Sequence, residues 1–174
     1  MDNKRFYHLI EEIRQQSSFA SLAYHHLRQS LQAMDQDKTF LFAHALLGHA
    51  HALSRWFWPA RPESQARGER LRQELKVADA SPLRKWPHRA QLEQPDEKFE
   101  DWLAQLNPPD YVQTNVMPTG TIGGYKPDRF LRSLDPESYR LDWGGESCDL
   151  RQLADEARRL EGAANLWLRT HNPW

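Results

Sequence analysis

The chain has 174 residues, 39% of them hydrophobic, and its 23 Lys and Arg residues against 24 Asp and Glu residues give a net charge of −1. This length allows one domain with a real core and is short for two, and the balanced charge excludes a globally basic surface for nucleic acid. Cys148 is the only cysteine, which excludes an intramolecular disulfide framework and a cysteine cluster for zinc, so we expect a cytoplasmic protein.

Two helices are expected in the first third of the chain. Over residues 2–34 apolar residues recur at three- and four-residue spacing, and charges interrupt every apolar run, so neither a signal peptide nor a membrane span is expected. Residues 37–58, DKTFLFAHALLGHAHALSRWFW, form the most apolar run. We expect a central helix that is buried on all sides, capped by Asp35 or Asp37 and ended by Pro59.

A polar stripe runs along this second helix, because His44, Gly48, His51 and Arg55 recur at spacings of four, three and four. One interpretation is a functional face, on which Gly48 lets another helix approach while His51 and Arg55 line a cleft. The other is a set of ordinary polar groups with satisfied hydrogen bonds. A zinc site made from His44, His49 and His51 is not favoured, since His49 leaves that face of the helix.

The most specific pattern lies between Pro82 and Leu106, in PLRKWPHRAQLEQPDEKFEDWLAQL. The residues that carry it are Arg89, Glu93, Asp96, Glu97, Lys98, Phe99, Glu100 and Trp102. They resemble a motif of the HEPN superfamily, Arg-Asn-x-x-Glu-His followed by x-Asp-Glu-Arg-Leu-Asp-x-Trp. This chain departs from the motif at Ala90, where the pattern has Asn, and at Gln94, where it has the signature His.

The resemblance implies an all-α fold, metal-independent cleavage of RNA, and a homodimer in which the Arg89 regions of two chains approach each other. It makes Arg89, Glu93 and Gln94 the catalytic positions, although a Gln side chain cannot carry a proton near neutral pH. Arg89 can still hold a phosphate, and we add Arg55 and Arg84 as candidate contacts to nucleic acid. Pro95 should start a new helix, so the turn that holds Arg89 and Gln94 is expected to be kinked or separate.

The last third changes character between residues 110 and 145, where Gly pairs, prolines and short β-prone runs appear. Residues 129–134 and 139–143 are expected to form a hairpin. The Gly-rich run 119–124 is not interpreted as a phosphate loop, because no helix opens after it, and its turns should serve short strands. Asp149 should cap a closing helix that runs to about Leu168.

The expected fold is therefore mainly α, a single HEPN-like domain over residues 1–174 with a small β-hairpin insertion at about 110–145 before the last helix. Two functions remain open. The first is a catalytically degenerate domain that binds RNA or a protein partner, or serves as a dimeric scaffold, in a bacterial stress or defence setting. The second is an active metal-independent endoribonuclease that uses Arg89 with His51, His44 or Glu93 as an unconventional proton carrier. We expect no metal, no cofactor and no membrane contact, and Ala90, Gln94 and Pro95 together favour the first function.

Overall fold

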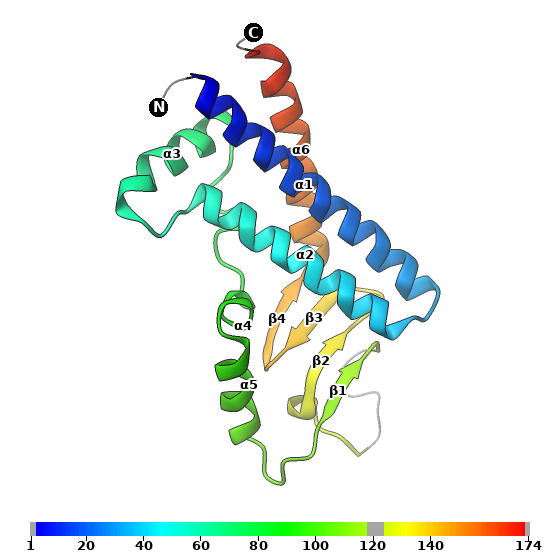
Figure 1. The fold of residues 1–174 in the computed structure, drawn as a ribbon. Helices are drawn as coiled ribbons and strands as arrows, with labels where there is room; N and C mark the ends of the chain where they lie inside the picture. The colour runs from blue at the N-terminus through cyan, green and yellow to red at the C-terminus, as the bar shows by residue number, and fades with distance from the viewer. Residues whose placement is uncertain (1–2, 118–123, 173–174) are drawn as a thin grey trace.

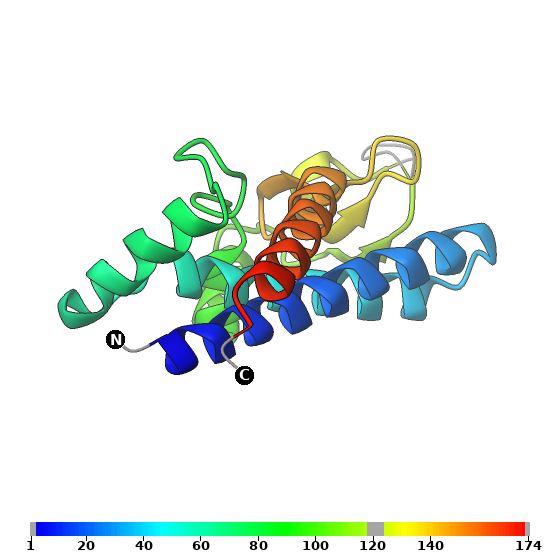
Figure 2. The same ribbon diagram turned by 90° about the horizontal axis from the view of Figure 1, so that it is seen from above.

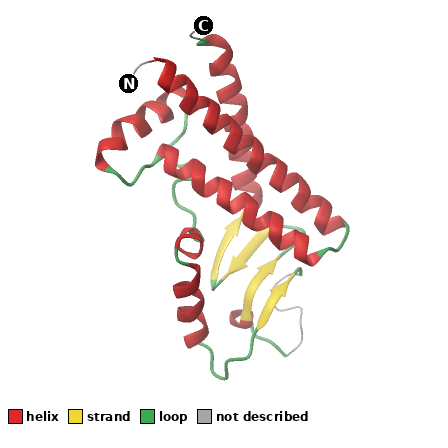
Figure 3. Cartoon of the chain, viewed as in Figure 1, coloured by secondary structure: helices red, strands yellow, loops and turns green. Residues whose placement is uncertain are grey.

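The structure is a computed structural model that describes residues 3–117 and 124–172. Its helices are α1 (Asn3–Gln32), α2 (Gln36–Phe57), α3 (Gln65–Glu74), α4 (Arg89–Glu93), α5 (Pro95–Ala104) and α6 (Leu150–Thr170), with short 3-10 turns at Pro62–Ser64 and Pro127–Arg129. The strands are β1 (Val112–Asn115), β2 (Phe130–Leu134), β3 (Arg140–Trp143) and β4 (Glu146–Asp149). Figures 1 and 3 show the long helices together and the strands gathered at one end of them, so the mainly α expectation is confirmed.

The three long helices form the main layer, and α1 packs along both α2 and α6 (Figures 1 and 2). The start of α1 meets the end of α6 where the rings of Phe6 and Trp167 lie 5.4 Å apart. As expected, α2 is the most buried, with nine buried residues out of 22 against nine of 30 in α1 and seven of 21 in α6. α1 is the principal partner of α2, which also contacts α6, whereas α5 contacts mainly α4.

The ends of α2 lie close to where the sequence predicts them, but its burial differs from the prediction. Asp35 is the N-cap and its side chain accepts a hydrogen bond from the backbone N–H of Lys38. All-round burial is wrong, because Leu41 is 62% exposed and Gly48 and Arg55 are exposed one and two heptads further along. Residues seven apart lie on the same helix face, so α2 keeps one open face. Among the described residues outside the α2 backbone, no atom lies within 4 Å of a side chain added at Gly48, so no other described helix approaches there.

The β region is larger than the expected hairpin. The two expected segments do pair antiparallel, as β2 and β3, but they form the centre of a four-stranded sheet with the order β1-β2-β3-β4. β1 pairs parallel with β2, and β4 pairs antiparallel with β3. Both added strands have four residues, too few for a clear alternating pattern. Residues 119–123, expected to serve short strands, lie outside the described residues.

The register of the sheet separates an apolar face from a polar one. Leu134 lies opposite Leu141, which lies opposite Cys148, and all three side chains are buried in the core against the helices. The neighbouring row is polar, with Asp142 opposite Ser147. The chain then enters α6 at Asp149, whose side chain accepts hydrogen bonds from the backbone N–H groups of the first turn, so the expected cap is confirmed.

Candidate phosphate-binding and acid-base site

The stretch between Arg89 and Trp102 folds as two short helices with a break between them. α4 is a five-residue helix, and Gln94 after it has φ −140° and ψ 61°, which is not helical. Pro95 then occupies the first position of α5, where its missing N–H costs nothing. The expected separation is confirmed, and it leaves Arg89 and Glu93 one helical turn apart on α4.

Arg89 and Glu93 meet a side chain from α2. Arg89 Nε donates to Glu93 Oε1 at 3.2 Å, and His51 Nε2 lies 3.6 Å from the same oxygen. The side chains of His51, Arg89 and Glu93 are 24%, 32% and 43% exposed, so solvent and ligands can reach all three. Arg55 lies one turn further along α2 and is exposed. We call His51, Arg55, Arg89 and Glu93 the His51 site.

The charge state of His51 follows from its surroundings. Burial lowers the pKa of His51 below its usual 6.5, the carboxylate of Glu93 raises it, and the guanidinium groups of Arg89 and Arg55 lower it. The imidazole is therefore neutral at pH 7 and can accept a proton. Its Nδ1 is buried without a hydrogen-bond partner among the described residues, so Nε2, beside Glu93, is the nitrogen that faces the site.

These groups can do two kinds of chemistry. Two guanidinium groups can hold a phosphate or a carboxylate through charge-assisted hydrogen bonds. A neutral imidazole and a carboxylate close to a guanidinium can also move protons to and from a reacting phosphodiester while Arg89 stabilises the developing negative charge. The ion pair of Arg89 with Glu93 is partly solvent-exposed and so is weak, and an incoming phosphate can compete with it.

Two predicted site residues lie outside these contacts. Gln94 is exposed at the break between α4 and α5, and no side-chain hydrogen bond of Gln94 occurs within the described part of the chain. Arg84 pairs with Asp79 through a 3.0 Å contact between Nη1 and Oδ1, and both side chains are exposed. Ala90, at the motif's Asn position, is half-buried on α4.

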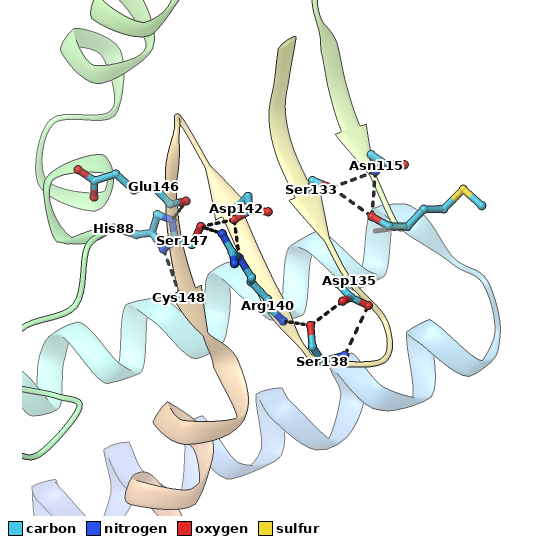
Figure 4. Close-up of polar contacts among 11 residues, drawn as sticks. His88, Asn115, Ser133, Asp135, Ser138, Arg140, Asp142, Glu146, Ser147 and Cys148 are labelled. Carbon is cyan, nitrogen blue, oxygen red and sulfur yellow. Dashed lines mark hydrogen bonds and ion pairs between the residues drawn. The ribbon is translucent and has the colours of Figure 1, made fainter. Parts of the chain in front are cut away.

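His88 is a structural anchor that the sequence did not reveal. Its ring is fully buried, with Nε2 2.9 Å from the carbonyl oxygen of Glu146 and Nδ1 3.2 Å from Cys148 Sγ (Figure 4). Because a carbonyl only accepts, Nε2–H donates to it and Nδ1 accepts the thiol proton. Burial lowers the pKa of His88 and raises that of Cys148 to about 12, so both groups are neutral at pH 7. The pair ties the start of α4 to β4.

A stack of rings connects α2 with the same region. The indole of Trp143 on β3 stacks with His44 of α2 at 4.7 Å and with His88 at 5.8 Å. Burial, with smaller effects of the charges of Arg132 and His88, lowers the pKa of His44 to about 4. His44 is therefore neutral at pH 7 and packs against Trp143, and no contact among the described residues joins it to the His51 site.

The outer face of the sheet carries a polar network that also went unnoticed in the sequence. Asn115, Ser133, Asp142 and Ser147 lie opposite one another across the four strands. Asn115 donates to Ser133 Oγ at 2.9 Å, while Arg140 and Ser147 both donate to Asp142 Oδ1 (Figure 4). A hollow of about 530 Å³ lies over this face. Asp142 is held by its neighbours, so we assign the network to sheet stability.

Comparison of the chain with protein-family models finds no match, and the comparisons with curated proteins and with solved structures find none either. Within residues 3–117 and 124–172, no group of three or more His, Cys, Asp or Glu side chains is placed to hold a metal ion. Nor is any described helix long and apolar enough to cross a membrane.

Proposed function

We propose that this protein is a HEPN-like helical domain that binds RNA by holding a backbone phosphate at the His51 site, with little or no catalysis of its own. The observation that carries the proposal is the shared carboxylate oxygen of Glu93, contacted by Arg89 at 3.2 Å and approached by His51 at 3.6 Å. It brings α2 and α4 together at one accessible point. Arg55 adds a second guanidinium whose charge already acts on His51.

Local charge supports this proposal where net charge does not. The chain as a whole has a net charge of −1, so long-range attraction to RNA is weak. The two guanidinium groups at the His51 site give a local contact of the kind that positions a protein on a phosphate backbone. Such contacts supply affinity without reading sequence, so we expect binding of modest strength that falls steeply with salt.

The departures from the HEPN motif support a binding role over catalysis. Gln94 replaces the residue that would carry the proton, and the backbone break at Gln94 separates it from the turn that holds Arg89. General acid-base catalysis is typically worth about 10²–10⁴-fold in rate, so its loss leaves cleavage slow. The guanidinium of Arg89 remains and binds a phosphate without any proton transfer.

A second candidate function is metal-independent cleavage of RNA, and the contact of His51 with Glu93 favours it. The neutral His51 would remove the proton from the 2′-hydroxyl, which attacks the adjacent phosphorus. The imidazolium formed in this way, stabilised by the Glu93 carboxylate, would deliver that proton to the departing 5′-oxygen, and Arg89 would stabilise the charge on the phosphoryl oxygens. The products would be a 2′,3′-cyclic phosphate and a free 5′-hydroxyl.

Binding is tested by fluorescence anisotropy with labelled single-stranded and structured RNA over a series of salt concentrations. Arg89→Ala should weaken binding and lower the slope of log Kobs against log salt by about one, because one phosphate contact is lost. Arg158→Ala is the matched control, since Arg158 is an exposed arginine that pairs with Asp155 on α6. Equal effects of the two substitutions, or no binding by the parent protein, would contradict the proposal.

Cleavage is tested by incubating the same RNAs with the parent protein in EDTA. The binding role predicts intact RNA, and Gln94→His together with Ala90→Asn should raise cleavage if the shape of the turn allows it. Cleavage by the parent that is lost in Arg89→Ala and in His51→Ala would instead establish the second function. A 2′,3′-cyclic phosphate end on the product would identify the chemistry.

We further propose a homodimer in which the His51 sites of two chains lie close together. The non-helical backbone of Gln94 separates it from the helical turn that holds Arg89, so one chain does not place the two residues on one face. The open face of α2 holds the exposed residues Gly48 and Arg55, so a second chain can pack against it. Light scattering should give the mass of two chains at micromolar concentration, and the mass of one chain would refute the dimer.

A further inference from the structure

Arg132 on β2 is a charged group for which the described structure supplies no counter-ion. Its side chain is half-buried, and its Nε is buried without a hydrogen-bond partner. No ion pair involves it within residues 3–117 and 124–172. Its guanidinium carbon lies 5.3 Å from the centroid of the Trp143 ring.

The half-buried arginines Arg72 and Arg67 show two outcomes. Arg72 donates to the carbonyl oxygen of Phe57. The Nε of Arg67, like that of Arg132, is buried without a hydrogen-bond partner among the described residues, and its guanidinium lies 5.2 Å from the ring of Trp56. Burial lowers the pKa of Arg132, because the charged guanidinium loses part of its hydration. A half-buried charge without a counter-ion is costly to the folded state.

The surroundings of Arg132 contain a second unsatisfied polar atom. His44 stacks on the same indole at 4.7 Å, and its Nε2 is buried without a partner among the described residues. The charge of Arg132 contributes to the low pKa of His44, so the two groups lie near each other. Tyr111 acts on Arg132 from the side of β1. A guanidinium, an imidazole and aromatic rings therefore converge between α2 and the sheet.

We propose that Arg132 and His44 form a binding site for an oxyanion, the phosphate or carboxylate group of a small ligand, on the helix-facing side of the sheet. The two Nη atoms of Arg132 are not among the buried atoms, so they are open to solvent and can donate to the anion. The neutral imidazole adds a polar atom, and Trp143 supplies an apolar wall for the rest of the ligand. The site shares no residue with the His51 site and goes beyond the RNA-binding role.

The proposal predicts stabilisation by oxyanions that depends on Arg132. Thermal unfolding is measured at constant pH and ionic strength with inorganic phosphate, acetate or chloride. A saturable rise of about 3–6 °C is expected at a concentration ten times the Kd, because the ligand binds only the folded chain. Phosphate and acetate distinguish the two ligand chemistries, and a rise with either one supports the site.

Variants separate this site from other sources of stabilisation. Arg132→Met should abolish the rise and, without oxyanions, should be at least as stable as the parent, because it replaces an unpaired charge by an apolar chain of similar length. Arg132→Gln is made beside it, so that poor folding of one variant leaves the test intact. Arg158→Met and Arg89→Ala should keep the rise, the latter showing that the His51 site is not its source.

Two results would overturn the proposal. One is a parent protein that phosphate and acetate stabilise no more than chloride does at the same ionic strength. The other is a rise that persists in both Arg132 variants. Because Arg89→Ala is measured in the same series, failure of the oxyanion site is distinguishable from failure of RNA binding at the His51 site.

Discussion

His51 is held between charges of opposite sign, and this makes its titration a direct report on the geometry of the site. The carboxylate of Glu93 favours the imidazolium, while Arg89 and Arg55 disfavour it, and burial is the largest influence. The balance keeps the ring neutral at pH 7. A ring in this state can accept a proton but adds no charge to the binding of a phosphate.

Substitution of Glu93 and substitution of Arg89 should move the pKa of His51 in opposite directions. Glu93→Gln removes the favourable carboxylate and should lower the pKa further, whereas Arg89→Ala removes an unfavourable cation and should raise it. Both shifts are measurable by NMR titration of the His51 ring protons. Arg158→Ala, remote on α6, serves as the control. A pKa that is the same in Glu93→Gln and Arg89→Ala would show that the three side chains do not meet in solution.

At the scale of elements, α3 and α6 show that glycine inside a helix can have opposite consequences. A side chain added at Gly68 of α3 would lie 2.7 Å from the carbonyl oxygen of Phe57 and from Cδ of Pro59, whereas nothing lies within 4 Å at Gly162 of α6. The absence of a side chain at Gly68 therefore lets α3 pack against the end of α2. Gly162 has no such neighbour.

We accordingly expect opposite signs for two Gly→Ala substitutions. Gly162→Ala should raise the free energy of unfolding by up to about 1 kcal/mol, because alanine has the higher helix propensity. Gly68→Ala should lower it by about 1–3 kcal/mol, because the added methyl group forces α3 away from α2. Urea denaturation of both variants beside the parent measures the difference. A stabilising Gly68→Ala would mean that α3 is not docked against α2 as described.

At the scale of the whole molecule, several histidines make folding sensitive to acid. The pKa of His44 is lowered to about 4, and burial lowers those of His49, His51 and His88. Below about pH 6.5 the unfolded chain binds protons that the folded chain does not. The stability from these groups is complete above their unfolded pKa and is lost as the pH falls towards their folded pKa.

The free energy of unfolding should therefore fall between pH 6.5 and 4, by at most about 1.4 kcal/mol per pH unit for each such histidine. His44→Phe keeps a ring against Trp143 but cannot titrate, so the fall should be less steep in this variant. Urea denaturation at a series of pH values measures the slope, with His25→Phe, an exposed position on α1, made as the control for the loss of a histidine. A slope unchanged by His44→Phe would contradict the buried, neutral state of His44.

The sequence by itself determined the helices and their ends. The local signals are long amphipathic periodicity, the caps at Asp35 and Asp149, and the prolines Pro59 and Pro95. A helix begins or ends within two residues of each cap and each proline. The break between Arg89 and the helix after Pro95 was likewise predictable, because proline acts on the residues next to it.

Only the tertiary structure decided what these elements bring together. Spacing along α2 put His44, His51 and Arg55 on one face, but it did not show that His51 meets Glu93 while His44 packs on Trp143. The partner of each residue comes from a segment about 40 or 100 positions away, and long-range pairing leaves no local pattern. The same reason hid β1, β4 and the unpaired Arg132, since a strand of four residues and a missing counter-ion are defined by neighbours in space.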